Sequence, residues 1–370
     1  MKGKKMIYLD NAATSPILDG VAEKMYEILK NEYGNPSSLH TLGMRAEEIM
    51  EEAREEIADS INARADEIYF ASSGTLADNT AVLGYLRRNK HSGKQVMISS
   101  AEHPAVYNLI PVLKKSGYEV LEIPIVDFDL DYGFIEKNIS ENTALISCMA
   151  VNNETGSRFD IKKIREIVNK KHLKTVIHSD CVQAYMKLPI DVRSFGADMI
   201  SLSAHKIGGP KGIGALYIKK GLLIEPLYYG GGQEKGIFSQ TEAIHNIAGF
   251  AEAVKINRRE DFNAKIKELS KIFLESLDSR IIVNSKNSVS EIINISVGIR
   301  SEIALHTLES EGVYVSSGSA CSQKKGEHNR VLKAFGLSKE KQDTALRISI
   351  GYTNTAEDMK TAAEFINKLK

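Results

Sequence analysis

The order of apolar and polar positions predicts alternating strands and helices over the first two thirds of the chain. Short apolar runs at 95–99, 144–151 and 198–203 are typical of buried strands. Segments with apolar residues at helical spacing lie between such runs, and 43–60 is the clearest of them. Short strands that alternate with amphipathic helices favour a mostly parallel, doubly wound α/β sheet with helices on both faces.

The pattern changes after the glycine triplet at 230–232. A long helical region is predicted at 241–277, and it is followed by short strands, a helix and a final helix that begins with a capping box at 355–358. Elements that are fewer and more mixed indicate a smaller α+β domain. We therefore expect a large domain of residues 15–255 and a small domain built from residues 1–14 and 256–370.

Composition narrows the classes of function. Hydrophobic residues make up 42% and charged residues 26%, and 48 acidic residues balance 48 basic ones. The chain as a whole therefore has no excess of positive charge that would favour binding to nucleic acid or to an acidic membrane. No apolar stretch approaches the roughly 20 residues that span a bilayer. We expect a cytoplasmic protein without a nucleic-acid or membrane partner.

The cysteines and histidines do not form a metal-binding pattern. Cys148, Cys181 and Cys321 are widely separated and odd in number, so they fit neither a disulfide framework nor a CxxC site. Because no His/Cys set or carboxylate cluster has the spacing of metal ligands, we expect no metal.

One lysine stands at the end of a predicted buried strand. The run Ser201-Leu202-Ser203-Ala204-His205-Lys206 leads directly into a glycine-rich turn at 208–212. Burying a lysine is costly unless the amine is paired or neutral. A desolvated lysine with a lowered pKa can form a Schiff base with a carbonyl cofactor or substrate. The alternative is a loop lysine beside a turn.

Three further groups of polar residues follow predicted strands, where ligands bind in doubly wound sheets. The small residues at 72–75 suit a phosphate, or they cap a helix. His103 is an acid/base group or an aromatic lid, or else a surface or capping residue. Asp180 balances a buried cation such as a protonated ring nitrogen, or it caps the segment that follows.

Cys321 lies in an unusual setting for a cysteine. It follows the small residues Ser317-Gly318-Ser319-Ala320 and precedes a polar stretch at 323–330, with Lys324 and Lys325 nearby. Nearby cationic groups favour the thiolate. This context indicates a reactive cysteine, whereas Cys148 and Cys181 are interpreted as packing residues.

Together these residues resemble the cysteine desulfurases, in the class V aminotransferase branch of fold-type I pyridoxal-phosphate enzymes. The matching motifs span almost the whole chain and comprise Tyr8-Leu9-Asp10-Asn11-Ala12-Ala13-Thr14, Gly34-Asn35-Pro36-Ser37-Ser38 with His40, Glu102-His103, Val151-Asn152-Asn153-Glu154-Thr155-Gly156, Asp180 with Gln183, the run 203–217 around Lys206, Ser317-Gly318-Ser319-Ala320-Cys321 and Leu346-Arg347-Ile348-Ser349.

The resemblance implies how the cofactor would be held. Lys206 would carry pyridoxal 5'-phosphate and then move the α-proton of the substrate, and Asp180 would pair with the pyridine nitrogen. His103 would stack on the ring and serve in proton transfer. The remaining contacts would come from Gly74, Thr75, Ser203 and His205 to the phosphate, from Asn153 and Gln183 to the ring and its phenolic oxygen, and from Thr241 to the phosphate of the neighbouring subunit.

The resemblance also implies the reaction. Arg347, with Asn35, would bind the carboxylate of L-cysteine. Cys321 would attack the substrate sulfur, which leaves a persulfide on the enzyme and releases alanine. The polar loop after Cys321 would carry the sulfur to an acceptor, such as an iron–sulfur scaffold or a tRNA-thiolation enzyme. A homodimer with an intersubunit active site is implied.

The sequence departs from the family's pattern in two places. Phe238-Ser239-Gln240-Thr241-Glu242 stands where Arg-Ser-Gly-Thr-Glu is usual. Thr241 is retained, whereas the arginine and glycine that flank the intersubunit phosphate contact in the family are replaced by Phe238 and Gln240. Ser73 and Leu76 replace a glycine and an acid of the phosphate loop. Three alternatives stay open: a selenocysteine lyase, another enzyme of the class V aminotransferase type, and a weakly active sulfur-relay paralogue.

Overall fold

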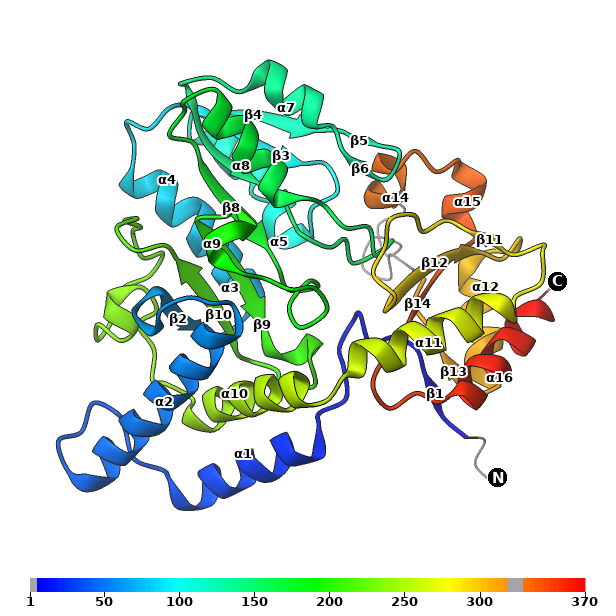
Figure 1. Ribbon diagram of the computed structural model, residues 1–370, viewed down its shortest axis with the longest axis horizontal. Coiled ribbons are helices and arrows are strands. Elements are labelled where there is room, and N and C mark those ends of the chain that lie inside the picture. Colours follow the sequence, from blue (N-terminus) through cyan, green and yellow to red (C-terminus); the bar gives the residue numbers. More distant parts are fainter. Residues whose placement is uncertain (1–4, 318–328, 370) are drawn as a thin grey trace.

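The computed structural model describes residues 5–317 and 329–369 and confirms the predicted α/β class. A seven-stranded sheet lies at its centre (Figure 1). In spatial order its strands are β2 (Ile68–Ala71), β10 (Gly214–Ile218), β9 (Met199–Ser203), β8 (Val176–Asp180), β7 (Thr143–Ser147), β3 (Gln95–Ser99) and β4 (Glu119–Ile123). Only β10 runs antiparallel to its two neighbours; the other pairs are parallel.

The central strands are buried on both faces. Every residue of β3, β7, β8, β9 and β10 is buried. This explains why β3, β7, β9 and β10 are mostly apolar or small in sequence rather than alternating, whereas β8 also buries the polar residues His178, Ser179 and Asp180. The carboxyl ends of β8 and β9 lie side by side, with Asp180 paired to Ser201.

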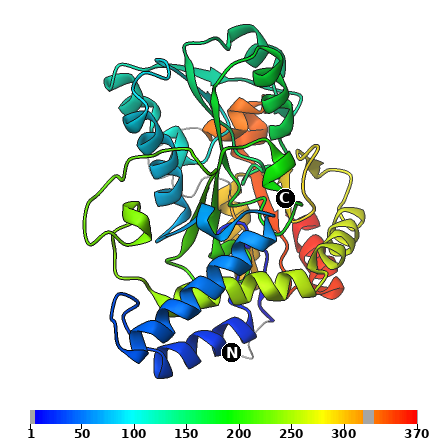
Figure 2. The ribbon, with the colours of Figure 1, turned by 60° about the vertical axis from the view of Figure 1, so that its left-hand side comes forward.

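Helices cover the sheet. They are α1 (Asp19–Asn31), α2 (Thr41–Ser60), α3 (Gly74–Asn79), α4 (Tyr85–Arg88), α5 (Pro104–Tyr107), α6 (Ile110–Lys115), α7 (Tyr132–Asn138), α8 (Ile161–Lys170), α9 (Val192–Phe195) and α10 (Ile244–Arg259). Figure 2 shows α1 and α2 lying together with α10, which is far from them in sequence. The predicted stripe of α2 is confirmed, because Ala46, Ile49, Ala53 and Ile57 are all buried.

Some predicted helices are interrupted. Residues 74–88 consist of α3, a π-helical turn at Thr80–Gly84, and α4. The long helical region predicted at 241–277 was wrong as a single element. It divides into α10 and α11 (Phe262–Glu275), because the Asp261 carboxylate accepts a hydrogen bond from the Ala264 N–H and starts a new helix.

A second, smaller set of elements has its own core. β11 (Ile282–Val283), β12 (Ile292–Ser296) and β14 (Ala345–Ser349) form an antiparallel sheet, and β1 (Ile7–Tyr8) pairs with β13 (Val313–Tyr314). α11, α12 (Ser301–Ser310) and α16 (Ala356–Asn367) contribute to this core. α14 (Arg330–Ala334) and α15 (Lys339–Asp343) are the remaining helices of this part of the chain, and Val331 and Leu332 of α14 pack in the larger core instead. The capping box that begins α16 is confirmed.

The N-terminal strand therefore joins the C-terminal part of the chain (Figure 1). Its apolar residues share a core with β12, β14 and α16. The division into a large domain of residues 15–255 and a small domain of residues 1–14 and 256–370 stays a prediction. A short hairpin of β5 (Ile125–Val126) and β6 (Asp129–Leu130) completes the described strands.

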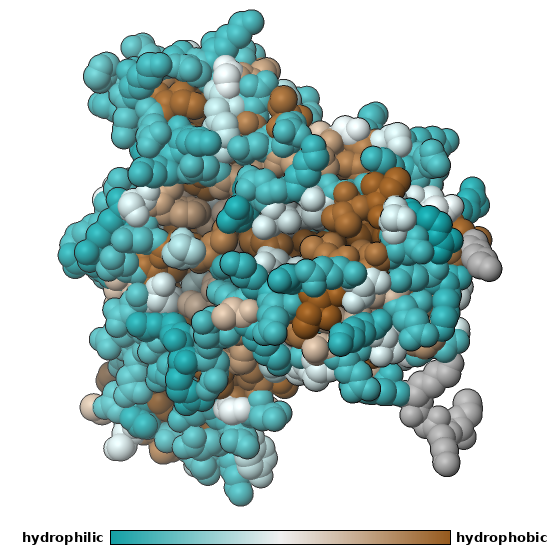
Figure 3. All heavy atoms as spheres, turned by 45° about the vertical axis from the view of Figure 1, so that its right-hand side comes forward, coloured by the Kyte–Doolittle hydropathy of each residue, from teal (hydrophilic) through white to brown (hydrophobic). Residues whose placement is uncertain are grey.

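The surface is mixed in character. The face drawn in Figure 3 is covered largely by hydrophilic residues, with apolar residues visible between them. Among the described helices, none is both long and apolar enough to cross a membrane.

Candidate active site

Lys206 lies in the short turn that follows β9, beside the carboxyl end of the sheet. Its Nζ donates hydrogen bonds to the carbonyl oxygens of Ala12 at 2.6 Å and Ala13 at 2.7 Å. Burial lowers the pKa of Lys206 to about 7, with a smaller contribution from the positive charge of Lys187. A substantial fraction of this amine is therefore neutral near pH 7, as Schiff-base chemistry requires.

The N-terminal segment passes directly over this turn. The Ser15 N–H donates to the His205 carbonyl at 2.9 Å, and the Ser15 hydroxyl donates to the Lys206 carbonyl at 3.3 Å. Gly208, at φ +76°, adopts a backbone conformation that L side chains rarely take, and its carbonyl accepts from the Leu18 N–H. Residues near 10 and near 206 thus form one surface.

Asp180 ends β8 and is buried. Its Oδ1 accepts the Val182 N–H at 2.9 Å. Burial raises the pKa of Asp180, while nearby His103 and Lys206 act in the opposite direction. A buried carboxylate of this kind is stabilised by a cation, and the protonated ring nitrogen of pyridoxal phosphate is such a group.

His103 has the capping role that the sequence left open. Its Nδ1 accepts the Ala105 N–H at 3.1 Å and caps α5. Since that nitrogen accepts, this hydrogen bond assigns the proton of the neutral ring to Nε2. Burial lowers the pKa of His103 and keeps the ring predominantly neutral. The ring is half-buried, so capping leaves Nε2 available to a ligand.

The proposed phosphate-binding residues gather around close backbone contacts. Ser73 caps α3, because its hydroxyl accepts the Leu76 N–H at 3.1 Å. A Cβ on Gly74 would stand 2.8 Å from Val182, and one on Gly214 would stand 2.6 Å from the Leu202 carbonyl. Glycine at both positions lets the loop after β2 pack directly on β9 and β10.

Ser203 and Thr75, two of the proposed phosphate-binding residues, differ in burial. Ser203 is buried, whereas Thr75 is exposed. The His205 Nδ1 lies 3.2 Å from the Thr14 hydroxyl, and burial lowers the pKa of His205 to about 4. His205 therefore meets a ligand as a neutral ring.

Gln183 and Asn153 have polar atoms directed into the same region. The Gln183 Nε2 donates to the Ala12 carbonyl at 2.8 Å, and its Oε1 accepts from Lys187 at 2.7 Å. The Asn153 Nδ2 donates to Glu154 at 3.1 Å, while its buried Oδ1 has no hydrogen-bond partner among the described residues.

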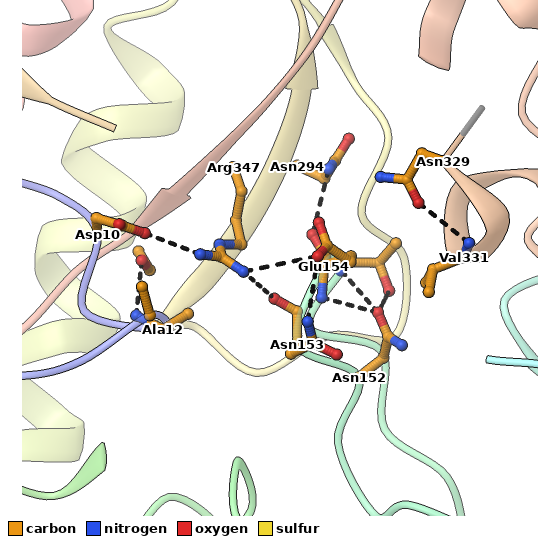
Figure 4. A network of polar contacts seen from close by, with 12 residues as sticks. Asp10, Ala12, Asn152, Asn153, Glu154, Asn294, Asn329, Val331 and Arg347 are labelled. Atoms are coloured by element: carbon orange, nitrogen blue, oxygen red, sulfur yellow. Dashed lines mark hydrogen bonds and ion pairs between the residues drawn. The ribbon is translucent and has the colours of Figure 1, made fainter. Parts of the chain in front are cut away.

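Arg347, on β14, is held by groups from distant parts of the chain (Figure 4). Its Nη2 donates to Asp10 at 2.8 Å and its Nη1 to the Asn153 carbonyl at 3.1 Å, with Glu154 Oε1 at 3.8 Å. Burial raises the pKa of Glu154 to about 7, although Arg347 opposes this shift. Asp10 is the more exposed of the two acids and can move away from the guanidinium at lower cost.

Three predicted site residues are not brought into this group. Asn35 and Thr241 are exposed, and within the described ranges neither is hydrogen-bonded to another candidate. The Asn35 Oδ1 instead accepts the Ser37 N–H at 2.9 Å within its own turn. Cys321 lies outside the described residues.

The segment that departs from the family's pattern is firmly packed. Phe238 is fully buried in the core with Leu216 and Ile218. Glu234 accepts two hydrogen bonds of 2.8 Å from Arg54, and both of these side chains are buried. The aromatic residue is thus accommodated inward, while Thr241 stays at the surface.

The sequence interpretation missed Asp10, Glu154 and Lys187. Asp10 and Glu154 were recognised only as parts of longer motifs, and Lys187 lies in an ordinary turn. The sequence did offer one signal for Glu154, because it directly follows Asn153, a residue already assigned to the site.

Cys148 and Cys181 are buried free thiols, and burial raises the pKa of both, which agrees with packing roles. Within the described ranges, no group of three or more His, Cys, Asp or Glu residues could hold a metal ion.

The residues gathered at this site fit pyridoxal phosphate. Lys206 supplies an amine that is readily neutralised, Asp180 a buried carboxylate and His103 a half-buried neutral ring. The glycines at 74 and 214 allow close backbone contacts. The residues present therefore match the predicted cofactor in charge and chemistry.

Known proteins resemble this chain over nearly all of its length. Residues 7–361 match the family model described as aminotransferase class-V. Cysteine desulfurase IscS 1 of Archaeoglobus fulgidus is 36% identical over 98% of this chain and 96% of its own length. Cysteine desulfurase IscS of Neisseria meningitidis is 38% identical over 99% and 92%.

Solved structures agree with these sequence relatives. A NifS-like protein superimposes with a TM-score of 0.92 at 31% identity, covering 98% of this chain and 99% of that one. A structure of SspA in complex with cysteine gives a TM-score of 0.83 at 32% identity, covering 93% and 98%.

The buried acid beside Arg347 predicts a pH dependence. The raised pKa of Glu154 stabilises the fold below its unfolded value of 4.5, and this contribution is lost as the pH rises through about 7. Glu154→Gln should therefore improve stability, relative to wild type, more at pH 7.5 than at pH 5, as measured by the midpoint of urea unfolding. The exposed Glu47→Gln serves as the control and should show no such difference. An equal effect of Glu154→Gln at the two pH values would contradict the assignment.

Proposed function

The chain belongs to the class V aminotransferase family and, within it, to the cysteine desulfurases, and on that basis we propose that it removes sulfur from L-cysteine and releases L-alanine. The observation that carries the proposal is the partly neutral Lys206 amine between Asp180 and Arg347. Pyridoxal phosphate, when bound, supplies an electron sink for the α-carbon of the substrate.

Lys206 and Asp180 divide the acid–base work. The Lys206 amine, neutral in part at pH 7, holds the cofactor and then takes the α-proton of the substrate. Asp180 provides the negative charge that favours a protonated ring nitrogen. His103 would pack against the ring of the cofactor, and the cap at Nδ1 leaves its Nε2–H for a proton-transfer step. Gly74, Thr75, Ser203 and His205 hold the phosphate, and Asn153 and Gln183 address the ring.

Arg347 binds the substrate carboxylate through its forked guanidinium. In the ligand-free arrangement one fork is occupied by Asp10, so the substrate carboxylate replaces that partner. Asn35 contributes from its exposed turn once the substrate is bound. The buried Nε of Arg347, which has no partner among the described residues, gives this side chain a further donor.

Cys321 accepts the sulfur. Its thiolate attacks the substrate sulfur, so an S–S bond forms as the Cβ–S bond breaks. The electron pair of the broken bond stays with the carbon chain, which is protonated and leaves as alanine. The product on the enzyme is a Cys321 persulfide, and a reductant or an acceptor protein then removes its terminal sulfur.

The partners follow from this chemistry. We infer a homodimer in which Thr241 reaches the cofactor phosphate of the neighbouring subunit, since Thr241 is exposed. The sulfur acceptor is an iron–sulfur scaffold or a tRNA-thiolation enzyme. A cytoplasmic location is supported by the buried free thiols of Cys148 and Cys181.

The first prediction concerns the reaction itself. Purified enzyme with pyridoxal phosphate, L-cysteine and a reductant should give sulfide and alanine in equal amounts. Lys206→Ala should abolish both products, because the amine and base are lost. Cys321→Ala should abolish sulfide from cysteine, whereas Cys148→Ala, which alters a packing cysteine, should retain at least about half of the activity.

The same variants distinguish the alternatives. If Cys321→Ala still releases selenide from selenocysteine at the wild-type rate and wild type prefers that substrate, the enzyme is a selenocysteine lyase. A colourless wild-type protein that gains no visible absorbance with pyridoxal phosphate would favour the sulfur-relay paralogue and contradict the proposal.

A second prediction concerns assembly. Light scattering should give about twice the chain mass of 40.9 kDa. Tyr26 and Leu29 are exposed on α1, at 66% and 56%, and a double change to Asp should weaken the dimer if this apolar surface is covered by the second copy. A wild-type mass of one chain would refute the intersubunit role of Thr241.

A further inference from the structure

Lys187 is a partly buried lysine that none of the roles above assigns. It lies in the turn after β8, four residues beyond Gln183, and its Nζ donates to Gln183 Oε1 at 2.7 Å. Lys187 and Lys206 line the same cavity, of about 50 Å³, together with Ser15, Glu291 and Tyr352. The two lysines are therefore neighbours in space although 19 positions separate them in sequence.

A continuous chain of hydrogen bonds joins the two amines. Gln183 accepts from Lys187 with Oε1 and donates from Nε2 to the Ala12 carbonyl at 2.8 Å. The same Ala12 carbonyl accepts from the Lys206 Nζ at 2.6 Å. Because an ammonium group only donates, Lys187 fixes the Gln183 oxygen on its own side and turns the amide N–H groups toward Ala12 and the site.

Charged groups from several elements face Lys206. Lys187, in the turn after β8, and Arg347, on β14, disfavour the protonated amine, whereas Asp10 and Asp180 favour it. His103 and His205 also lie within electrostatic range. After burial, Lys187 has the largest effect on the pKa of Lys206. Lys187 itself faces the buried Glu291, which partly offsets the cost of its own burial.

We propose that Lys187 is a positioning residue of this active site, which fixes the amide of Gln183 as a donor and favours the neutral amine of Lys206 through its charge. The proposal rests on the proposed function only for the assignment of Lys206 as the cofactor lysine. A Gln183 held in this orientation presents N–H groups to a ligand, and these suit an acceptor such as a phenolate oxygen. One side chain thus prepares both the amine and its neighbour before any ligand binds.

The charge is tested in the full-length apoenzyme, where neither cofactor nor substrate is needed. Limiting acetic anhydride is applied between pH 5.5 and 9.5, and mass spectrometry of the Lys206 peptide gives the midpoint of its reactivity. The wild-type midpoint should lie at about 7. Lys187→Met and Lys187→Gln should raise it by about half a pH unit or more, whereas Lys187→Arg should leave it nearly unchanged.

Burial lowers the pKa of Lys187 to about 8, so the orientation of Gln183 is tested at pH 7, where Lys187 is largely protonated. The measurement is the affinity of the apoenzyme for pyridoxal phosphate in Lys187→Gln and Lys187→Met, which both lack the charge and therefore its effect on Lys206. Lys187→Gln keeps a donor, whereas Lys187→Met leaves the amide free to turn and should bind about three- to tenfold more weakly than Lys187→Gln.

The exposed Lys174→Met is the matched control and should shift neither measurement. An unchanged Lys206 midpoint in folded Lys187→Met and Lys187→Gln, as judged by circular dichroism, would overturn the electrostatic role. Equal cofactor affinities of these two variants would overturn the orienting role. Absence of sulfide production by wild type would refute the proposed function and leave both of these readouts intact.

Discussion

The proposed site depends above all on how the chain holds the partly buried amine of Lys206. Burying an unpaired ammonium group is costly. Here two carbonyl oxygens of the N-terminal segment accept hydrogen bonds from the Lys206 amine. Burial still lowers the pKa of Lys206 to about 7. The amine is therefore present near pH 7 both as a hydrogen-bonded cation and as a neutral nucleophile. The N-terminal strand must pair with β13 and the segment after it must cross the sheet edge for those carbonyls to be in place.

That crossing segment joins the two cores of the molecule. Asp10 pairs with Arg347 from the smaller sheet, while Ala12 and Ala13 contact Lys206 from the larger one. The proposed carboxylate-binding and cofactor-binding groups are therefore held by neighbouring residues of one strand end. The proposed chemical role of His103 is compatible with its structural one, because it caps α5 through Nδ1 and this bond does not involve Nε2.

Much of this could be predicted from the sequence because it depends on local pattern. Strands such as β9 are short runs of apolar residues and serine, and a lysine shortly after such a strand requires an explanation whatever the fold. The break between α10 and α11 was missed because a capping aspartate at 261 lies within an otherwise continuous helical period. The Asp10–Arg347 pair joins residues that are 337 positions apart, and no local rule predicts such a contact.

Lys187 was missed for the same reason, since its importance arises from a cavity that it shares with Lys206. Asn35 and Thr241 are exposed, so their roles depend on a substrate or a second subunit rather than on this chain's own packing.

The central claim is that Lys206, and no other lysine, carries pyridoxal phosphate. The most direct measurement is borohydride reduction of the yellow holoenzyme, followed by proteolysis and mass spectrometry of the lysine-containing peptides. The account predicts that the mass of the reduced cofactor appears on the peptide containing Lys206, and that Lys206→Ala abolishes it. Labelling of Lys187 instead, or no covalently retained cofactor after reduction, would contradict the account.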